Sequence, residues 1–74
     1  MTLDQLSMGQ CARVIRLRDQ CAMRERLQDL GVIPGREISV QMRSPLGDPT
    51  AYAVCGAVIA LRAEDASGVE IHMI

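Results

Sequence analysis

Apolar and polar residues alternate along several stretches of the chain, which is the pattern of a β-strand buried on one face. The clearest stretch is residues 37–42, where Ile38, Val40 and Met42 alternate with polar residues and are predicted to face the core. Strands are also predicted for residues 10–17, 50–55, 57–62 and 69–73.

The first of these strands contains both apolar and charged side chains. Ala12 and Val14 are predicted on one face, with Arg13, Ile15 and Leu17 on the other. This assignment follows because side chains alternate between the two faces of a regular strand.

Between the first two strands the apolar period changes. Met23, Leu27 and Leu30 recur at i, i+4 and i+7, which predicts an amphipathic helix over residues 19–30, about three turns long. Asp19 is a suitable N-cap, and Gly31 stands where a left-handed residue would end the helix.

Glycine and proline mark the connections between these elements. Pro34-Gly35 predicts a turn before the second strand. Residues 44–49 contain two prolines and a glycine, which predicts a stiff exposed loop. The opening residues predict a short helical or irregular lead-in, with a turn at Gly9.

Several short strands with tight connections in a chain of 74 residues favour a single domain, residues 1–74. The predicted fold class is mainly β: a small SH3-like, partly open barrel of about five strands with one amphipathic helix. The helix is expected to lie across one end of the barrel, with Met23, Leu27 and Leu30 plugging it.

Composition and charge narrow the classes of function. The formal net charge is −1 and Tyr52 is the only aromatic residue, so no nucleic-acid partner is expected. The longest aliphatic run, residues 57–61, is too short to span a membrane, and residues 1–4 lack the features of a signal peptide. We therefore expect a cytoplasmic protein without membrane insertion.

Cys11, Cys21 and Cys55 are odd in number and widely spaced, which indicates reduced thiols whose default role is packing. With His72 they could be counted as a zinc set, but the closely spaced pairs typical of such sites are missing. His72, with Glu70 beside it on the same strand, is the remaining candidate for a metal contact. We expect no required cofactor and at most weak binding of a divalent metal.

Catalysis is not expected, because the sequence offers no Ser/His/Asp set and no paired carboxylates near a phosphate loop. A pairing of Cys55 with His72 stays open at this stage. Arg24 and Arg26 could serve as arginine fingers for a partner GTPase, although a solvated helix face explains both residues.

Three motifs resemble those of FeoA domains. Residues 24–38, RERLQDLGVIPGREI, resemble the pattern R-x-x-L-x-x-L-G-x-x-P-G-x-x-I/V; residues 45–49 are similar to its P-x-G-D-P loop, and residues 56–62 to its G-x-x-I-A-L-R strand. The resemblance implies an SH3-like accessory protein of the ferrous iron transporter FeoB, whose cytoplasmic guanine-nucleotide-binding region is the expected partner. It implies no catalytic residues.

The simplest role of Leu30-Gly31 and Pro34-Gly35 is to end the helix and turn the chain. The loop at residues 45–49 is different, because an apolar side chain near its tip has less structural need. Both segments together form the predicted partner-binding site, which consists of Leu30, Gly31, Pro34, Gly35, Pro45, Leu46, Gly47, Asp48 and Pro49.

Two alternatives stay open. The carboxy-terminal domain of DtxR-like repressors is similar in fold, so the chain could be a metal-responsive SH3-like regulatory module. Exposed edges of a small barrel also permit a homodimer through strand pairing.

Overall fold

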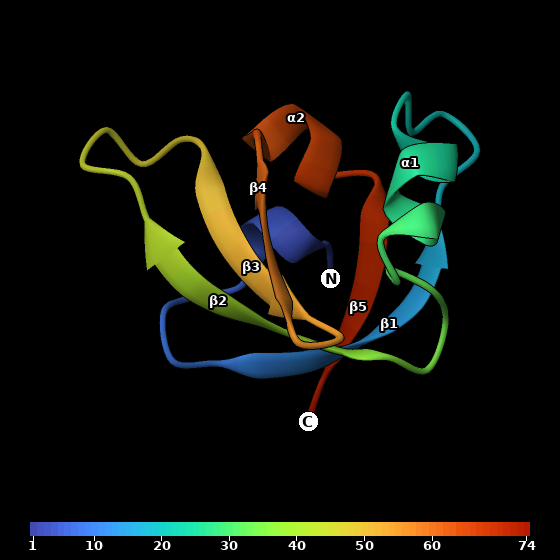
Figure 1. Ribbon diagram of the computed structural model, residues 1–74, viewed down its shortest axis with the longest axis horizontal. Coiled ribbons are helices and arrows are strands. Elements are labelled where there is room, and N and C mark those ends of the chain that lie inside the picture. The colour runs from blue at the N-terminus through green and yellow to red at the C-terminus, as the bar shows by residue number, and fades with distance from the viewer.

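The computed structural model describes residues 1–74 and contains one antiparallel sheet of five strands in the order β4-β3-β2-β1-β5. The sheet curls strongly but does not close, because β4 and β5 are not paired with each other (Figure 1). The elements are η1 (Leu3–Gln5), β1 (Cys11–Leu17), α1 (Arg24–Asp29), β2 (Glu37–Arg43), β3 (Thr50–Val54), β4 (Ala57–Leu61), α2 (Ala63–Ala66) and β5 (Val69–Met73). The predicted partly open barrel of five strands is confirmed, but it carries two short helices instead of one.

The core lies inside the curl of the sheet. Tyr52 on β3 is its largest fully buried side chain, and Leu3 and Leu6 from the start of the chain are fully buried with it. The lead-in is therefore part of the core: η1 confirms the expected short helical turn, and Gly9, at φ +79°, makes the turn into β1.

β1 contains a bulge that overturns the prediction for Leu17. Val14 pairs with Ile71 and Arg16 with Glu70, so that Ile15 is the extra residue. One extra residue reverses the alternation beyond it. Leu17 consequently returns to the buried side, while Ile15 is half exposed.

A second bulge has the opposite effect on β2. Val40 pairs with Tyr52 and Met42 with Ala51, which leaves Gln41 as the extra residue. Ile38 and Val40 are buried as predicted, but Met42 is 64% exposed. The prediction that Met42 faces the core is therefore wrong.

The helix is shorter than its pattern predicted, because α1 begins only at Arg24, with Met23 as its N-cap. The preceding residues form turns, with N–H groups of Cys21 and Arg24 donating to carbonyls three residues back. Asp19 is not a cap; its carboxylate pairs with Arg24 at 3.1 Å. Only Leu27 of the predicted apolar face is fully buried, whereas Met23 is partly buried and Leu30 is exposed.

The second helix, α2, lies between the strands predicted at residues 57–62 and 69–73, where no helix was predicted. Its N-cap residue, Arg62, makes no side-chain cap, and the missing acceptor comes from a distant segment. The Asp48 Oδ1 atom accepts a hydrogen bond of 2.8 Å from the N–H of Ala63. One helical turn whose cap is supplied by another loop leaves no periodic signal in the sequence.

The start of the chain covers one edge of the sheet and leaves the other open. The β5 edge is covered by the start of the chain, since the Ile71 N–H donates to the Met1 carbonyl at 2.9 Å and Thr2 forms a bridge with Glu70. No such segment pairs with β4. Neither helix is long and apolar enough to cross a membrane.

Candidate docking surfaces

The end of α1 is built by a complete Schellman motif. The Gly31 N–H donates to the Gln28 carbonyl at 3.1 Å, and the Val32 N–H donates to the Leu27 carbonyl at 2.9 Å. Gly31 has φ +100°, a conformation that favours glycine. The predicted helix stop is confirmed, and it directs Val32 into the core beside Leu27.

The Pro34-Gly35 turn fastens this corner to the sheet. The Arg36 N–H donates to the Ile33 carbonyl at 3.2 Å, with Gly35 at φ +91°. On the β1 side, the Gly35 N–H donates to the Val14 carbonyl at 2.8 Å, and the Arg36 carbonyl accepts from the Val14 N–H at 2.9 Å. The structural role predicted for this turn is therefore confirmed, although Pro34 and Gly35 remain exposed.

The hairpin between β3 and β4 packs on the same corner. Its two turn residues, Cys55 and Gly56, both have positive φ, +52° and +76°. The Cys55 thiol lies 3.7 Å from the Gly31 carbonyl oxygen, and its sulfur accepts a hydrogen bond of 3.0 Å from Arg36 Nη1. A Cβ atom on Gly31 would approach Cys55 Sγ to 2.8 Å, so Gly31 is needed for space as well as for its backbone angle.

The predicted packing role fits Cys21 alone. Cys21 is partly buried against the core, whereas Cys11 and Cys55 are exposed. The physical reason is their position in the sheet: Cys11 pairs with Ser39 at the start of β1, and Cys55 occupies a hairpin turn.

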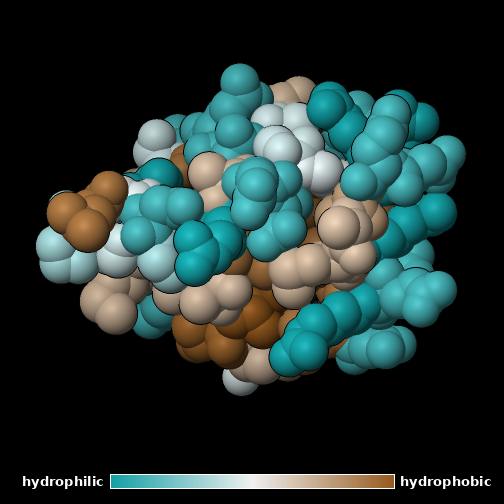
Figure 2. Space-filling model, turned by 90° about the horizontal axis from the view of Figure 1, so that it is seen from above, coloured by the Kyte–Doolittle hydropathy of each residue, from teal (hydrophilic) through white to brown (hydrophobic).

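The loop between β2 and β3 projects from the other end of the molecule. It is held by a turn in which the Gly47 N–H donates to the Ser44 carbonyl at 2.8 Å. Leu46 is 94% exposed, the largest exposure among the large apolar residues. Figure 2 shows apolar atoms at the projecting tip of this loop. The exposed apolar side chain expected there is thus present.

Asp48, predicted as a contact residue, also has a role inside the molecule, because its carboxylate caps α2. We expect Asp48→Ala to lower the free energy of unfolding by about 1 kcal/mol, since an N–H at the start of a helix loses its acceptor. Asp48→Asn keeps an acceptor oxygen and should cost about half as much or less. Urea unfolding of the three proteins measures this; equal losses in both variants would contradict the capping role.

The nine predicted contact residues do not form one patch. Leu30, Gly31, Pro34 and Gly35 precede β2, and the loop follows it, so the two groups are separated by the length of a seven-residue strand, about 20 Å. In Figure 1 they lie toward opposite ends of the molecule's longest dimension, which is 29 Å. A partner that contacts both groups must extend along β2.

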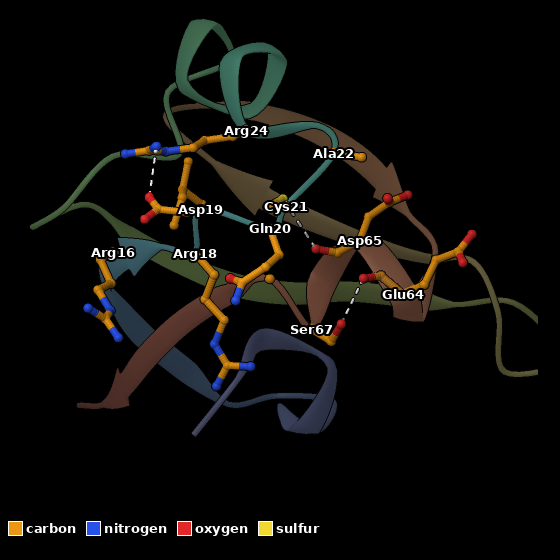
Figure 3. Close-up of a pocket in the computed structure, with 12 residues that line it drawn as sticks. Arg16, Arg18, Asp19, Gln20, Cys21, Ala22, Arg24, Glu64, Asp65 and Ser67 are labelled. Atoms are coloured by element: carbon orange, nitrogen blue, oxygen red, sulfur yellow. Dashed lines mark hydrogen bonds and ion pairs between the residues drawn. The ribbon is translucent and has the colours of Figure 1, made fainter.

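An open cavity of about 990 Å³ forms a third surface that the sequence did not indicate. It lies between the β1–α1 connection and the α2–β5 connection (Figure 3). Arg16 and Arg18 lie on one side of it in Figure 3, and Glu64 and Asp65 lie on the other. Its lining includes three Arg and three acidic residues, so it carries no net charge and suits a polar, dipolar contact.

Close packing brings the two connections of this cavity together. The Cys21 thiol lies 3.9 Å from the Asp65 carbonyl oxygen, and a Cβ on Gly68 would approach Cys21 Cβ to 2.7 Å. The cavity could not be found from the sequence, because its two sides are more than 40 residues apart and meet only through this contact.

Glu70 is engaged by arginines next to this cavity. Arg16 Nε donates to its carboxylate, and Arg18 Nε lies 4.0 Å away. The hydrogen bond from Arg16 is the main reason that the pKa of Glu70 lies below its ordinary value; the charges of Arg16 and Arg18 add to it, and partial burial opposes it. The carboxylate is therefore ionised and already partnered at neutral pH.

His72, the other candidate for a metal contact, is exposed on β5 as predicted and stands opposite Arg13 on β1. No group of three or more metal-capable side chains gathers anywhere in the chain. Cys55 and His72 belong to different regions, since Cys55 contacts Gly31 and Arg36 at the β3–β4 hairpin and β5 is at the far side of the strand order from β4. The Cys55–His72 pairing that the sequence left open is therefore not among the contacts of either residue.

Arg24 and Arg26, considered as fingers for a partner GTPase, are both exposed on α1. Arg24 pairs with Asp19, which fixes it beside the cavity (Figure 3).

A family model for the FeoA domain matches residues 1–73. A fusion protein of Porphyromonas gingivalis, Fe(2+) transport protein A joined to Fe(2+) transporter FeoB, is 32% identical over all 74 residues, and the chain spans 9% of its length. The solution structure of the FeoA protein of Chlorobium tepidum has a TM-score of 0.91 at 34% identity, with 100% of this chain and 70% of that chain covered.

Stenotrophomonas maltophilia FeoA, described as a procaryotic SH3 domain protein complexed with zinc, has a TM-score of 0.86 at 29% identity, covering 97% of this chain and 89% of that one. A manganese-dependent transcriptional repressor shares the fold alone, with a TM-score of 0.87 at 18% identity over 100% of this chain and 36% of that one. The three motifs that resemble the FeoA pattern in sequence form the helix end with its turn, the projecting β2–β3 loop, and β4 with its flanking residues Gly56 and Arg62. The chain therefore belongs to the FeoA domain family.

Proposed function

We propose that this chain is a noncatalytic, cytoplasmic accessory protein of ferrous iron uptake that binds and modulates a FeoB-type transporter. The observation that carries the proposal is the fusion in Porphyromonas gingivalis, where a domain 32% identical to this chain is part of one polypeptide with FeoB. Covalent linkage holds two partners at high effective concentration, which is useful when they act together.

The cytoplasmic guanine-nucleotide-binding region of the transporter is the proposed binding partner. Two features support a docking role. One is the projecting β2–β3 loop with a 94% exposed Leu46, and the other is the helix end at the opposite end of the molecule, where Leu30, Pro34 and Gly35 are exposed. A projecting apolar side chain on a well-held loop loses little conformational freedom on binding, which favours affinity. Binding by such a contact requires no catalytic residue on this chain.

We expect Leu46→Ala to weaken binding to that region about tenfold or more, because the truncated side chain would be a buried anchor in the complex. The exposed position predicts an unchanged melting temperature. Titration calorimetry with the purified region, with and without ferrous iron, measures the affinity.

Leu30→Ala is the matched control, since Leu30 is 37% exposed and lies in the other predicted group. If only Leu30→Ala weakens binding, the helix corner is the contact and the loop is not. If the wild-type chain does not bind the region at all, the adaptor proposal fails.

A metal-responsive module, the alternative suggested by the repressor-like fold, has less support in the geometry. Its candidate ligands are His72 and Glu70, and the Glu70 carboxylate is already held by Arg16. Tight, stoichiometric uptake of ferrous iron without binding to the transporter region would favour this alternative.

A further inference from the structure

The β4 edge is open, whereas the chain covers its β5 edge with its own first residues. An open edge presents unpaired N–H and C=O groups, and proteins usually protect it with charged residues, proline or a bulge. β4 contains none of these: its sequence is Ala-Val-Ile-Ala-Leu, and it pairs with β3 without a register shift. The edge is therefore a template for another strand.

The register of the hairpin shows which groups point outward. Val54 pairs with Ala57 across the two-residue turn, so this pair exchanges hydrogen bonds, as do alternate pairs beyond it. Ile59, paired with Tyr52, thus points its backbone groups at β3. Val58 and Ala60 point theirs away from the sheet.

A band of uncharged side chains crosses the outer face of the sheet from β4 to the start of β1. They are Cys11, Ser39, Met42, Ala51, Ala53, Val58 and Ala60, placed on one face by the strand register. Figure 2 shows apolar atoms gathered at its lower edge, on the side where β4 stands in front in Figure 1. Charged residues lie beyond this band, where Arg13 on β1 pairs with Glu37 on β2 at 3.8 Å.

We propose that β4 pairs antiparallel with β4 of a second copy, about a two-fold axis that passes beside Ile59. In this register Val58 faces Ala60 of the partner copy, and Ala60 faces its Val58. Each of these two pairs can exchange two backbone hydrogen bonds, because both residues point their N–H and C=O groups outward.

The occupant is a second copy because the edge is self-complementary. In this two-fold register, both residues whose backbone groups point away from the sheet, Val58 and Ala60, meet such a residue of the partner's β4. No other two-fold register within β4 pairs both of them in this way. Arg62, the first charged residue after the strand, then faces Gly56 of the partner copy, so no charged side chain meets a like charge directly. The isologous contact closes on itself and makes a dimer with one continuous ten-stranded sheet.

The contact is small, five residues on each side, so the dimer belongs to the weak class of interfaces. We expect a dissociation constant in roughly the 10 µM to 1 mM range. Sedimentation equilibrium up to about 1 mM chain should show a monomer–dimer equilibrium. In the dimer, hydrogen exchange at the Val58 and Ala60 N–H groups should slow, with no change at Ile59.

Two variants test the register. Ala60→Pro removes an outward N–H, which an edge strand tolerates, and by symmetry it deletes two of the four hydrogen bonds. Val58→Lys places a charge on the edge itself. Each should raise the dissociation constant about tenfold or more, while the amide NMR spectrum of the core is retained.

Ala53→Lys and Val58→Thr are the matched controls. Ala53 lies directly opposite Val58 on the same outer face, but on β3 instead of the edge strand. A lysine at residue 53 therefore adds the same charge to this face without placing it on the edge. It would disrupt a dimer that packs through the face of the sheet more than one that pairs through the edge. Val58→Thr keeps the shape of the edge without a charge. The dissociation constant of the dimer should stay within about threefold of the wild-type value in both variants.

The proposal is overturned if the chain remains monomeric to about 1 mM, or if the dimer survives both Ala60→Pro and Val58→Lys. It is also overturned if Ala53→Lys abolishes association and Val58→Lys does not. None of these results depends on binding to a transporter, so failure here and failure of the proposed function are separable.

Discussion

Leu27→Asp is expected to leave the chain unfolded at neutral pH. Leu27 is fully buried and is the only residue of α1 that is. Removing its side chain from the core costs about 2–5 kcal/mol, and an uncompensated buried carboxylate adds several more. A chain of 74 residues has a total stability of about 4–11 kcal/mol, so the substitution removes most or all of it. Circular dichroism and a one-dimensional NMR spectrum measure the outcome.

Leu30→Asp is the control, because it makes the same change three residues later on the same predicted apolar face. Leu30 is 37% exposed, so the variant should remain folded and lose about 1 kcal/mol, largely from a negative charge at a helix C-terminus. The helical pattern alone predicts that both variants unfold. If Leu30→Asp unfolds the chain as fully as Leu27→Asp, α1 does not pack on the core through Leu27 alone.

Gly31→Ala is expected to lower the free energy of unfolding by about 2–4 kcal/mol. The left-handed backbone at φ +100° costs a residue with a Cβ about 1–2 kcal/mol. The new Cβ would also stand 2.8 Å from Cys55 Sγ, which requires the hairpin turn to shift. Equilibrium unfolding in urea measures the change.

Gly35→Ala separates the two contributions, because Gly35 has a similar φ of +91° but no atom would lie within 4 Å of a Cβ at this position. It should cost only the backbone part, about 1–2 kcal/mol. In a Cys55→Ala background the cost of Gly31→Ala should fall toward the same value, since the sulfur is gone. Equal costs for the two glycines in the wild-type background would contradict the contact with Cys55.

Gly31 shows why the end of α1 is easy to recognise in the sequence. Gly31 ends α1, sets the path of Val32 into the core and leaves room for the β3–β4 hairpin. Few other residues can replace it, because the position requires both a left-handed backbone and the absence of a Cβ atom. The same residues therefore identify the family and hold the fold, which leaves the exposed Leu46 as the clearest residue of these motifs that is free to contact a partner.

The proposed transporter contact and the proposed β4 pairing use different surfaces. The loop with Leu46 joins β2 to β3, whereas the outward groups of β4 belong to Val58 and Ala60. A dimer through β4 would carry two copies of the loop, which raises the effective concentration of the second contact once the first has formed.

The candidate site was predictable in part. Glycine and proline spacing indicated the helix end, the turn and the loop, since glycine favours positive φ and proline fixes φ at about −65°. The pattern could not show that Asp48 caps a helix formed by residues 63–66, because the bond at 2.8 Å joins segments 15 residues apart. Nor could it show the cavity around Arg16, Arg18 and Asp65, whose sides meet across more than 40 residues.

The five strands, the turns at Gly9, Gly31 and Gly35 and the family could all be predicted from the amino-acid sequence, because alternation, glycine positions and motif order are local properties of the chain. The sides that Leu17 and Met42 face depend on strand pairing, since each residue lies beyond a bulge whose extra residue is defined by the partner strand. The start of α1 and the identity of the open sheet edge likewise follow from the folded structure. Those outcomes depend on contacts between residues far apart in the chain, and the local pattern contains no information about them.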